Sequence, residues 1–146
     1  MYSKYEIIPF KSAGPVFFGM TKEEVKRTLG EPFRVSKISK KTDLYVYEHI
    51  NIYFSKADNL VREVLFDENA NVVIGDVNVF GDQDALKRLI AMDGKPYEYF
   101  GAIMLFNLGI TLGGFHNDDD KTITVFKENI LKKFKQKAKP FVFEDL

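Results

Sequence analysis

The feature that most constrains this chain is an internal repeat. The segment GPVFFG at residues 14–19 returns as GDVNVFG at residues 75–81, and the downstream segments of the first copy return in the same order in the second. The later matches pair EVKR at 24–27 with ALKR at 85–88, GEP at 30–32 with GKP at 94–96, INIYF at 50–54 with LGITL at 108–112, and VLF at 64–66 with TVF at 124–126. A copy of this size buries too little surface to fold alone. We therefore expect one domain over residues 1–146, with repeats at about 14–66 and 75–126 and a helix and tail at 127–146.

Each copy opens with a short predicted helix. In the first copy Thr21 is the predicted N-cap, Glu24 completes a capping box, and Gly30 ends the helix. In the second copy Asp82 is the predicted cap and Gly94 ends the helix. The same start and stop signals in two places support a duplication.

Strand-like sequence comes after each helix. Residues 44–54 and 102–112 are rich in aromatic and β-branched side chains, and residues 61–66, 122–126 and 72–80 have the same character. A third helix is predicted over residues 128–138, before Pro140. The predicted fold class is α+β: two tandem α–β repeats form a shared antiparallel sheet with helices packed on one face, plus a C-terminal helix.

Composition excludes several function classes. The chain has 21 Lys and Arg residues against 21 Asp and Glu residues, so no net charge steers it to nucleic acid or to a membrane surface. It contains no Cys, which removes disulfides, thiolate nucleophiles and cysteine-based metal sites. The N-terminus has no apolar targeting segment and no apolar run approaches a membrane span. We expect a cytoplasmic protein.

Catalysis finds little support in the sequence. No nucleophile elbow, zinc-protease helix, phosphate-binding loop or dinucleotide fingerprint is present. His49 and His116, the only histidines, have no nucleophile pattern beside them. We expect a protein that is not an enzyme and that has no cofactor.

Residues 44–54 hold the principal candidate binding residues, and two interpretations are open. As one continuous strand, this segment lines an outer face with Tyr45, Tyr47, His49, Asn51 and Tyr53, an aromatic stripe typical of binding hot spots. A two-residue hairpin turn at residues 48–49 instead places Tyr45 and Tyr47 in the core. Asn51 and Tyr53 point outward in both cases, and Gly109 and Thr111 are their equivalents in the second copy. The competing structural interpretation is a sheet face that is solvated or covered by the third helix.

An acidic loop holds His116, Asp118, Asp119 and Asp120. One imidazole with three carboxylates has ligands suited to a divalent cation, but Asn and Asp are also the residues that turns use, and the repeat places this loop on a hairpin turn. We expect no metal here and interpret Asp118 and Asp120 as acidic contacts to a partner. The lysine-rich segment over residues 127–139 has a helical apolar stripe, which we expect to dock on the domain with its lysines in solvent.

The strings FGMTKEEV at residues 18–25 and LGEP at residues 29–32 resemble the opening of the β-lactamase-inhibitor-protein-like fold, which includes small outer-membrane assembly lipoproteins. The inhibitors are tandem duplications whose sheets join into one concave surface that grips a protein. This chain departs from the pattern at residues 81–83 of the second copy and lacks the lipidated cysteine and the disulfides of those relatives. Small bacterial proteins of this kind in a reducing compartment, where disulfides do not form, resemble immunity proteins, which neutralise a toxin.

These observations predict a non-enzymatic protein-binding module, most concretely an immunity, antitoxin or inhibitor protein that occludes the functional site of a partner toxin or enzyme. The alternatives are a small-ligand-binding domain or small enzyme that uses the concave sheet face, and a binder of anionic surfaces through the lysine-rich C-terminal segment. The expected partner is a protein, not nucleic acid or a membrane.

Overall fold

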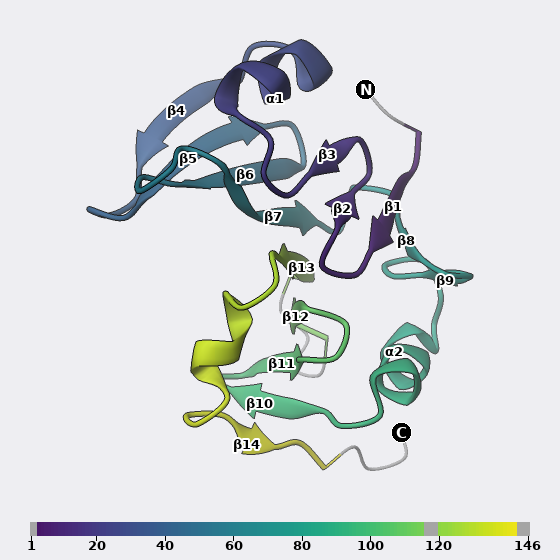
Figure 1. The fold of residues 1–146 in the computed structure, drawn as a ribbon. Coiled ribbons are helices and arrows are strands. Elements are labelled where there is room, and N and C mark those ends of the chain that lie inside the picture. The colour runs from purple at the N-terminus through teal and green to yellow at the C-terminus, as the bar shows by residue number, and fades with distance from the viewer. Residues whose placement is uncertain (1–2, 116–119, 143–146) are drawn as a thin grey trace.

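The computed structural model describes residues 3–115 and 120–142, which form two sheets packed face to face (Figure 1). The larger sheet has nine antiparallel strands in the order β14-β10-β11-β12-β13-β7-β6-β5-β4. Its two central strands, β7 and β13, come from different halves of the chain and pair with Val64 opposite Val125. The strand bounds are β4 (Arg34–Lys37), β5 (Thr42–Tyr47), β6 (Ile50–Ser55), β7 (Val61–Asp67), β10 (Tyr97–Tyr99), β11 (Ala102–Leu105), β12 (Ile110–Gly113), β13 (Thr122–Phe126) and β14 (Lys139–Pro140).

The smaller sheet has five short strands in the order β3-β2-β1-β8-β9. Their bounds are β1 (Tyr5–Ile8), β2 (Ser12–Ala13), β3 (Val16–Phe17), β8 (Val72–Ile74) and β9 (Val77–Asn78). Strands β1 and β8 run parallel, and the other pairs are antiparallel. Apolar side chains of this sheet enter one hydrophobic core with those of the large sheet, and the rings of Tyr5 and Phe66 lie 5.1 Å apart between their centroids.

The predicted α+β fold class is therefore wrong. The described residues contain two short α-helices, α1 (Lys22–Leu29) and α2 (Ala85–Asp93), and one 3-10 turn, η1 (Leu131–Phe134). The core is mainly sheet against sheet, because strands from residues 5–17 and 72–78 cover the face that the prediction assigned to helices. Amphipathic helices were visible in the sequence, but strands of two or three residues have no comparable periodic signal.

The expected C-terminal helix over residues 128–138 is also wrong. Only the four residues of η1 form a helical turn there. Lysines recur four residues apart in this segment, at Lys133 and Lys137 and at Lys135 and Lys139, and like charges at this spacing destabilise an α-helix. The apolar residues of the segment nevertheless pack on the domain, because Leu131 is buried against Met104 and Phe126.

The predicted start of α1 is confirmed. The Oγ1 atom of Thr21 accepts a hydrogen bond from the backbone nitrogen of Glu24 at 3.1 Å, and Oε1 of Glu24 accepts one from the backbone nitrogen of Thr21 at 3.0 Å. Two of the N–H groups that a helix start leaves unpaired are satisfied in this way. The helix ends before Gly30, whose φ of +86° suits a residue without a side chain.

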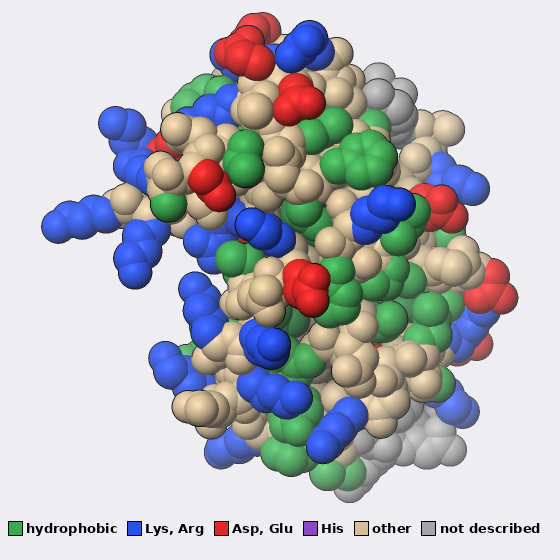
Figure 2. All heavy atoms as spheres, in the orientation of Figure 1, with side chains coloured by type: hydrophobic (Ala, Val, Ile, Leu, Met, Phe, Trp, Pro, Cys, Tyr) green, Lys and Arg blue, Asp and Glu red, His purple; other side chains and the backbone are tan. Residues whose placement is uncertain are grey.

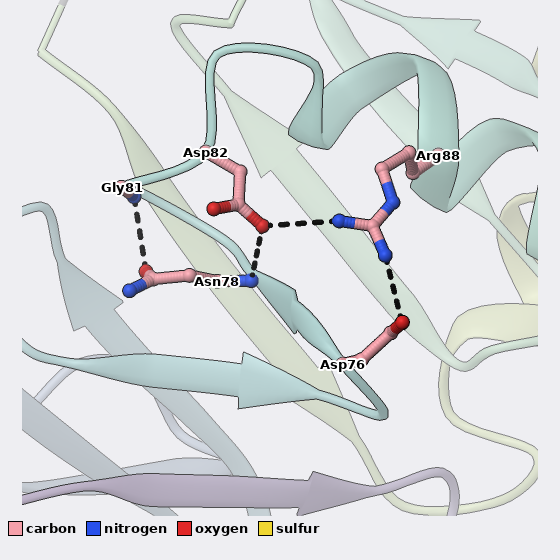
Figure 3. A network of polar contacts seen from close by, with 5 residues as sticks. All are labelled: Asp76, Asn78, Gly81, Asp82 and Arg88. Atoms are coloured by element: carbon pink, nitrogen blue, oxygen red, sulfur yellow. Dashed lines mark hydrogen bonds and ion pairs between the residues drawn. The ribbon is translucent and has the colours of Figure 1, made fainter.

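The predicted cap of the second helix is wrong. Asp84 occupies the N-cap of α2 without a capping hydrogen bond, while Asp82 takes part in a polar network (Figure 3). An oxygen of Asp82 accepts hydrogen bonds from the backbone nitrogen of Asn78 at 2.9 Å and from Nη1 of Arg88 at 3.2 Å. Arg88 also forms an ion pair with Asp76 at 2.8 Å. The carboxylate of Asp82 therefore ties α2 to the β8–β9 hairpin.

The hairpin interpretation of residues 44–54 is confirmed. Strands β5 and β6 are joined by a two-residue turn in which His49 has a φ of +65°. The register places Tyr47 opposite Ile50 and Tyr45 opposite Ile52. Both tyrosines consequently share the inner face of the sheet with these isoleucines.

Candidate functional site

The face of the large sheet turned away from the small sheet is the candidate binding surface, here called the open face. In β6, Ile50, Ile52 and Phe54 are buried in the core, so Asn51 and Tyr53 point to the open face. Strand pairing aligns one side chain from each of six strands in a single row on this face: Val46, Asn51, Leu65, Thr124, Thr111 and Met104.

The C-terminal segment covers one end of the open face. Leu131 of η1 forms a buried cluster with Met104 and Phe126, against which Tyr97 and Phe134 pack. Met104, beneath this segment, is only 5% exposed. This end of the sheet face is therefore covered by the C-terminal segment, although not by the helix that was predicted there.

Six other side chains of the open face are partly exposed, and we call them the floor. The floor consists of Val46, Asn51, Tyr53, Leu65, Thr111 and Thr124, each of which is intermediate between buried and exposed. These side chains combine an aromatic ring, two aliphatic groups, an amide and three hydroxyls. Such a mixture can bury apolar area against a partner and also direct hydrogen bonds to it.

An ion pair borders the floor at a β-bulge. The register of β6 and β7 places Tyr53 opposite Glu63 but Phe54 opposite Val61, so Arg62 is an extra residue in the ladder. The Nε atom of Arg62 lies 3.1 Å from Oε1 of Glu63. Burial raises the pKa of Glu63, while the positive charges of Arg62 and Lys133 oppose that shift. Burial also raises the pKa of Tyr53.

Three residues predicted for the binding surface do not belong to the floor, because the hairpin reverses the chain. Tyr45 is 5% exposed on the inner face, with its ring centroid 4.8 Å from that of Phe54. The hydroxyl of Tyr47 donates to the carbonyl oxygen of Gly30 at 2.8 Å, and burial raises the pKa of Tyr47 to about 12. His49 lies in the turn, with Nδ1 2.9 Å from a carboxylate oxygen of Asp67.

The other predicted residues have mixed positions. Asn51, Tyr53 and Thr111 lie on the floor. Asp120 is exposed just before β13, whereas Asp118, with His116 and Asp119, lies outside the described residues. Among residues 3–115 and 120–142, no three His, Asp or Glu side chains group closely enough to hold a metal ion.

Sequence reasoning missed Leu65, Thr124 and Val46 as floor residues. Residues 61–66 and 122–126 were predicted as strands, so alternation along them could have assigned Leu65 and Thr124 to the outer face. The pairing of β7 with β13 is what brings the two residues side by side, and it depends on tertiary structure. The bulge at Arg62 has no signal of its own in the sequence.

The structure offers little for a small ligand at the floor. A cavity of about 230 Å³ lies beside η1 and is lined by Phe10, Phe106 and Lys132 among others, not by floor residues. A larger hollow of about 440 Å³ beside β1 and β3 is likewise lined by other residues, among them Lys4, Ile8 and Phe17. Among the described residues, the two carboxyls whose pKa is raised by burial have partners within the fold: Glu63 pairs with Arg62, and Asp93 accepts backbone hydrogen bonds.

In comparisons with known proteins, no protein family, no curated protein and no solved structure matches this chain. The resemblance of residues 18–32 to the inhibitor fold thus stays a prediction. Within the described part of the chain, neither helix has the length and apolar character of a membrane-spanning segment.

Proposed function

We propose that this protein is a non-enzymatic protein-binding module whose floor occludes the functional site of a partner protein, as an inhibitor or immunity protein does. The observation that carries the proposal is the row of partly exposed side chains from Asn51 through Leu65 and Thr124 to Thr111. The chain leaves this row open although it covers the neighbouring Met104.

The position of the floor on inner strands of the large sheet supports a binding role. Strands β6, β7, β13 and β12 each pair with a neighbour on both sides, so the backbone beneath these side chains is held by two ladders. A preformed surface loses less conformational freedom when a partner binds. An open sheet face also suits a protein surface better than a small molecule, which needs enclosure.

The resemblance of residues 18–32 to the inhibitor fold points to the same role. The absence of cysteine suits a reducing compartment, and we propose the cytoplasm as the location.

The proposal is tested by affinity capture from a lysate of the organism that encodes the chain, followed by titration of the purified captured protein. The test bait is the double variant Tyr53→Ala/Asn51→Ala. The matched control is Phe17→Ala/Asn69→Ala, which removes one aromatic ring and one amide from β3 and from the turn after β7. Urea unfolding of each bait verifies that it folds.

The expected result is one protein whose affinity falls at least about tenfold for the floor variant, since buried aromatic anchors contribute most to such interfaces. The control variant should bind like the wild type. Equal affinity of the floor variant and the wild type for every captured protein would contradict the proposal.

A further inference from the structure

We propose that the partner of the floor is an acidic protein surface, held between two basic rims that face each other across the floor. This inference rests on the proposed function and specifies the chemistry of the partner. It starts from an uneven distribution of charge in a chain whose net charge is zero. Residues 33–41 and 129–139 contain nine of the 21 Lys and Arg residues and none of the 21 Asp and Glu residues.

The first rim is the β4–β5 hairpin at the edge of the large sheet. Its basic residues Arg34, Lys37, Lys40 and Lys41 are all exposed, and none has an ion pair within the part of the chain that the structure describes. Lysines on an edge strand also protect it from aggregation. Protection alone does not account for Ile38, which lies among these lysines and is 54% exposed.

The second rim is the C-terminal segment over residues 129–139. Leu131 anchors it on the open face through Met104 and Phe126. Its five lysines, at positions 132, 133, 135, 137 and 139, are exposed. Lys133 is close enough to Glu63 to lower the pKa of that carboxyl, which places this rim beside the floor.

The two rims border one hollow. Figure 2 shows Lys and Arg side chains along the left of the molecule, above and below an indentation between the β4–β5 hairpin and the C-terminal segment. Glu63, which lies beside the floor, is paired with Arg62. Like charges on both sides of a hollow repel each other, and an acidic partner placed between them removes that repulsion.

A protein surface fits this hollow better than nucleic acid does. Eight of the nine basic residues are Lys, whereas Arg is the residue that binds phosphate in a bidentate manner. The exposed Ile38 on the first rim, and Leu65 on the floor, provide apolar contact area of the kind found in protein interfaces.

The test uses fluorescence anisotropy with a labelled oligo-glutamate peptide as the probe. One variant neutralises the first rim, Arg34→Gln/Lys40→Gln/Lys41→Gln, in which Arg34 lies opposite Val46 of the floor, and another the second, Lys133→Gln/Lys135→Gln/Lys137→Gln. The matched control, Lys4→Gln/Lys11→Gln/Lys87→Gln, removes the same charge from exposed lysines beside β1 and on α2. A labelled oligothymidine and vesicles containing phosphatidylserine are titrated in parallel.

We expect each rim variant to bind the peptide roughly tenfold more weakly than the wild type, while the control changes by less than about twofold. The inference is overturned if the control loses as much affinity as the rim variants, if the peptide does not bind, or if oligothymidine or vesicles bind more tightly through the same lysines. These outcomes leave the floor-variant capture unaffected, so an acidic partner and a binding floor can fail separately.

Discussion

A carboxylate oxygen of Asp93 lies 3.0 Å from the backbone nitrogen of Leu108, so the end of α2 is tied to the turn between β11 and β12. The same carboxylate accepts hydrogen bonds from the backbone nitrogens of Asn107 at 2.8 Å and Lys95 at 3.2 Å. Asp93 is buried, and burial raises its pKa despite these three donors. It is thus a structural carboxylate that holds a strand turn in place.

Replacing Asp93 with Ala should lower the free energy of unfolding by about 1–3 kcal/mol, because the N–H groups of Asn107 and Lys95 lose this acceptor and that of Leu108 keeps only the carbonyl oxygen of Leu105. The Asp93→Asn variant keeps one acceptor oxygen and should lose less. Urea unfolding followed by circular dichroism measures both values. Equal losses for the two variants would show that the carboxylate is not needed as an acceptor.

Arg62 and Glu63 are consecutive residues whose side chains are paired, although neighbours in a regular strand point to opposite faces. The bulge in β7 permits this pairing.

A carboxyl whose pKa is raised in the folded state, as that of Glu63 is, binds its proton more tightly there than in the unfolded chain. Its contribution to stability is therefore largest at low pH and is lost as pH rises from the ordinary value of 4.5 through the higher folded-state pKa.

We consequently predict that the stability of the wild type relative to Glu63→Gln falls as the pH rises from about 4 to about 8. The measurement is the free energy of unfolding of both proteins in urea across this interval. The same series for Glu6→Gln, an exposed glutamate on β1, corrects for the loss of one negative charge. A difference that rises with pH, or that does not change, would contradict the prediction.

The capping box of α1 gives a third prediction. Thr21→Ala should lower the free energy of unfolding by about 1 kcal/mol, and Thr21→Ser should restore most of it, because serine presents the same hydroxyl oxygen to Glu24. A double-mutant cycle with Glu24→Ala tests the coupling, since each side chain bonds the backbone nitrogen of the other residue. Additive effects of the two alanine substitutions would mean that the two bonds form independently.

The sequence allowed some side chains, but not all, to be assigned to a face or to a cap. The turn at residues 48–49 was one of two interpretations that the sequence left open, and its presence assigns Tyr45 and Tyr47 to the inner face. Asn51 and Tyr53 could be placed on the outer face because alternation holds for either interpretation of that segment. The cap at Asp82 was wrong because a carboxylate three residues from a helix can equally bond a neighbouring hairpin and an arginine, as Asp82 does with Asn78 and Arg88.

The features that the sequence determined by itself are local: the capping box at Thr21 and the end of α1 at Gly30, each of which depends on residues that lie within a few positions of one another. Only the tertiary structure decided that the small sheet covers the inner face, that β7 pairs with β13 at the centre of the floor, and that the C-terminal segment lies across one end of the open face. The reason is physical. Hydrogen bonds in turns and caps join residues close in the chain, whereas burial of apolar surface is non-directional and can be achieved by any segment that reaches the exposed face.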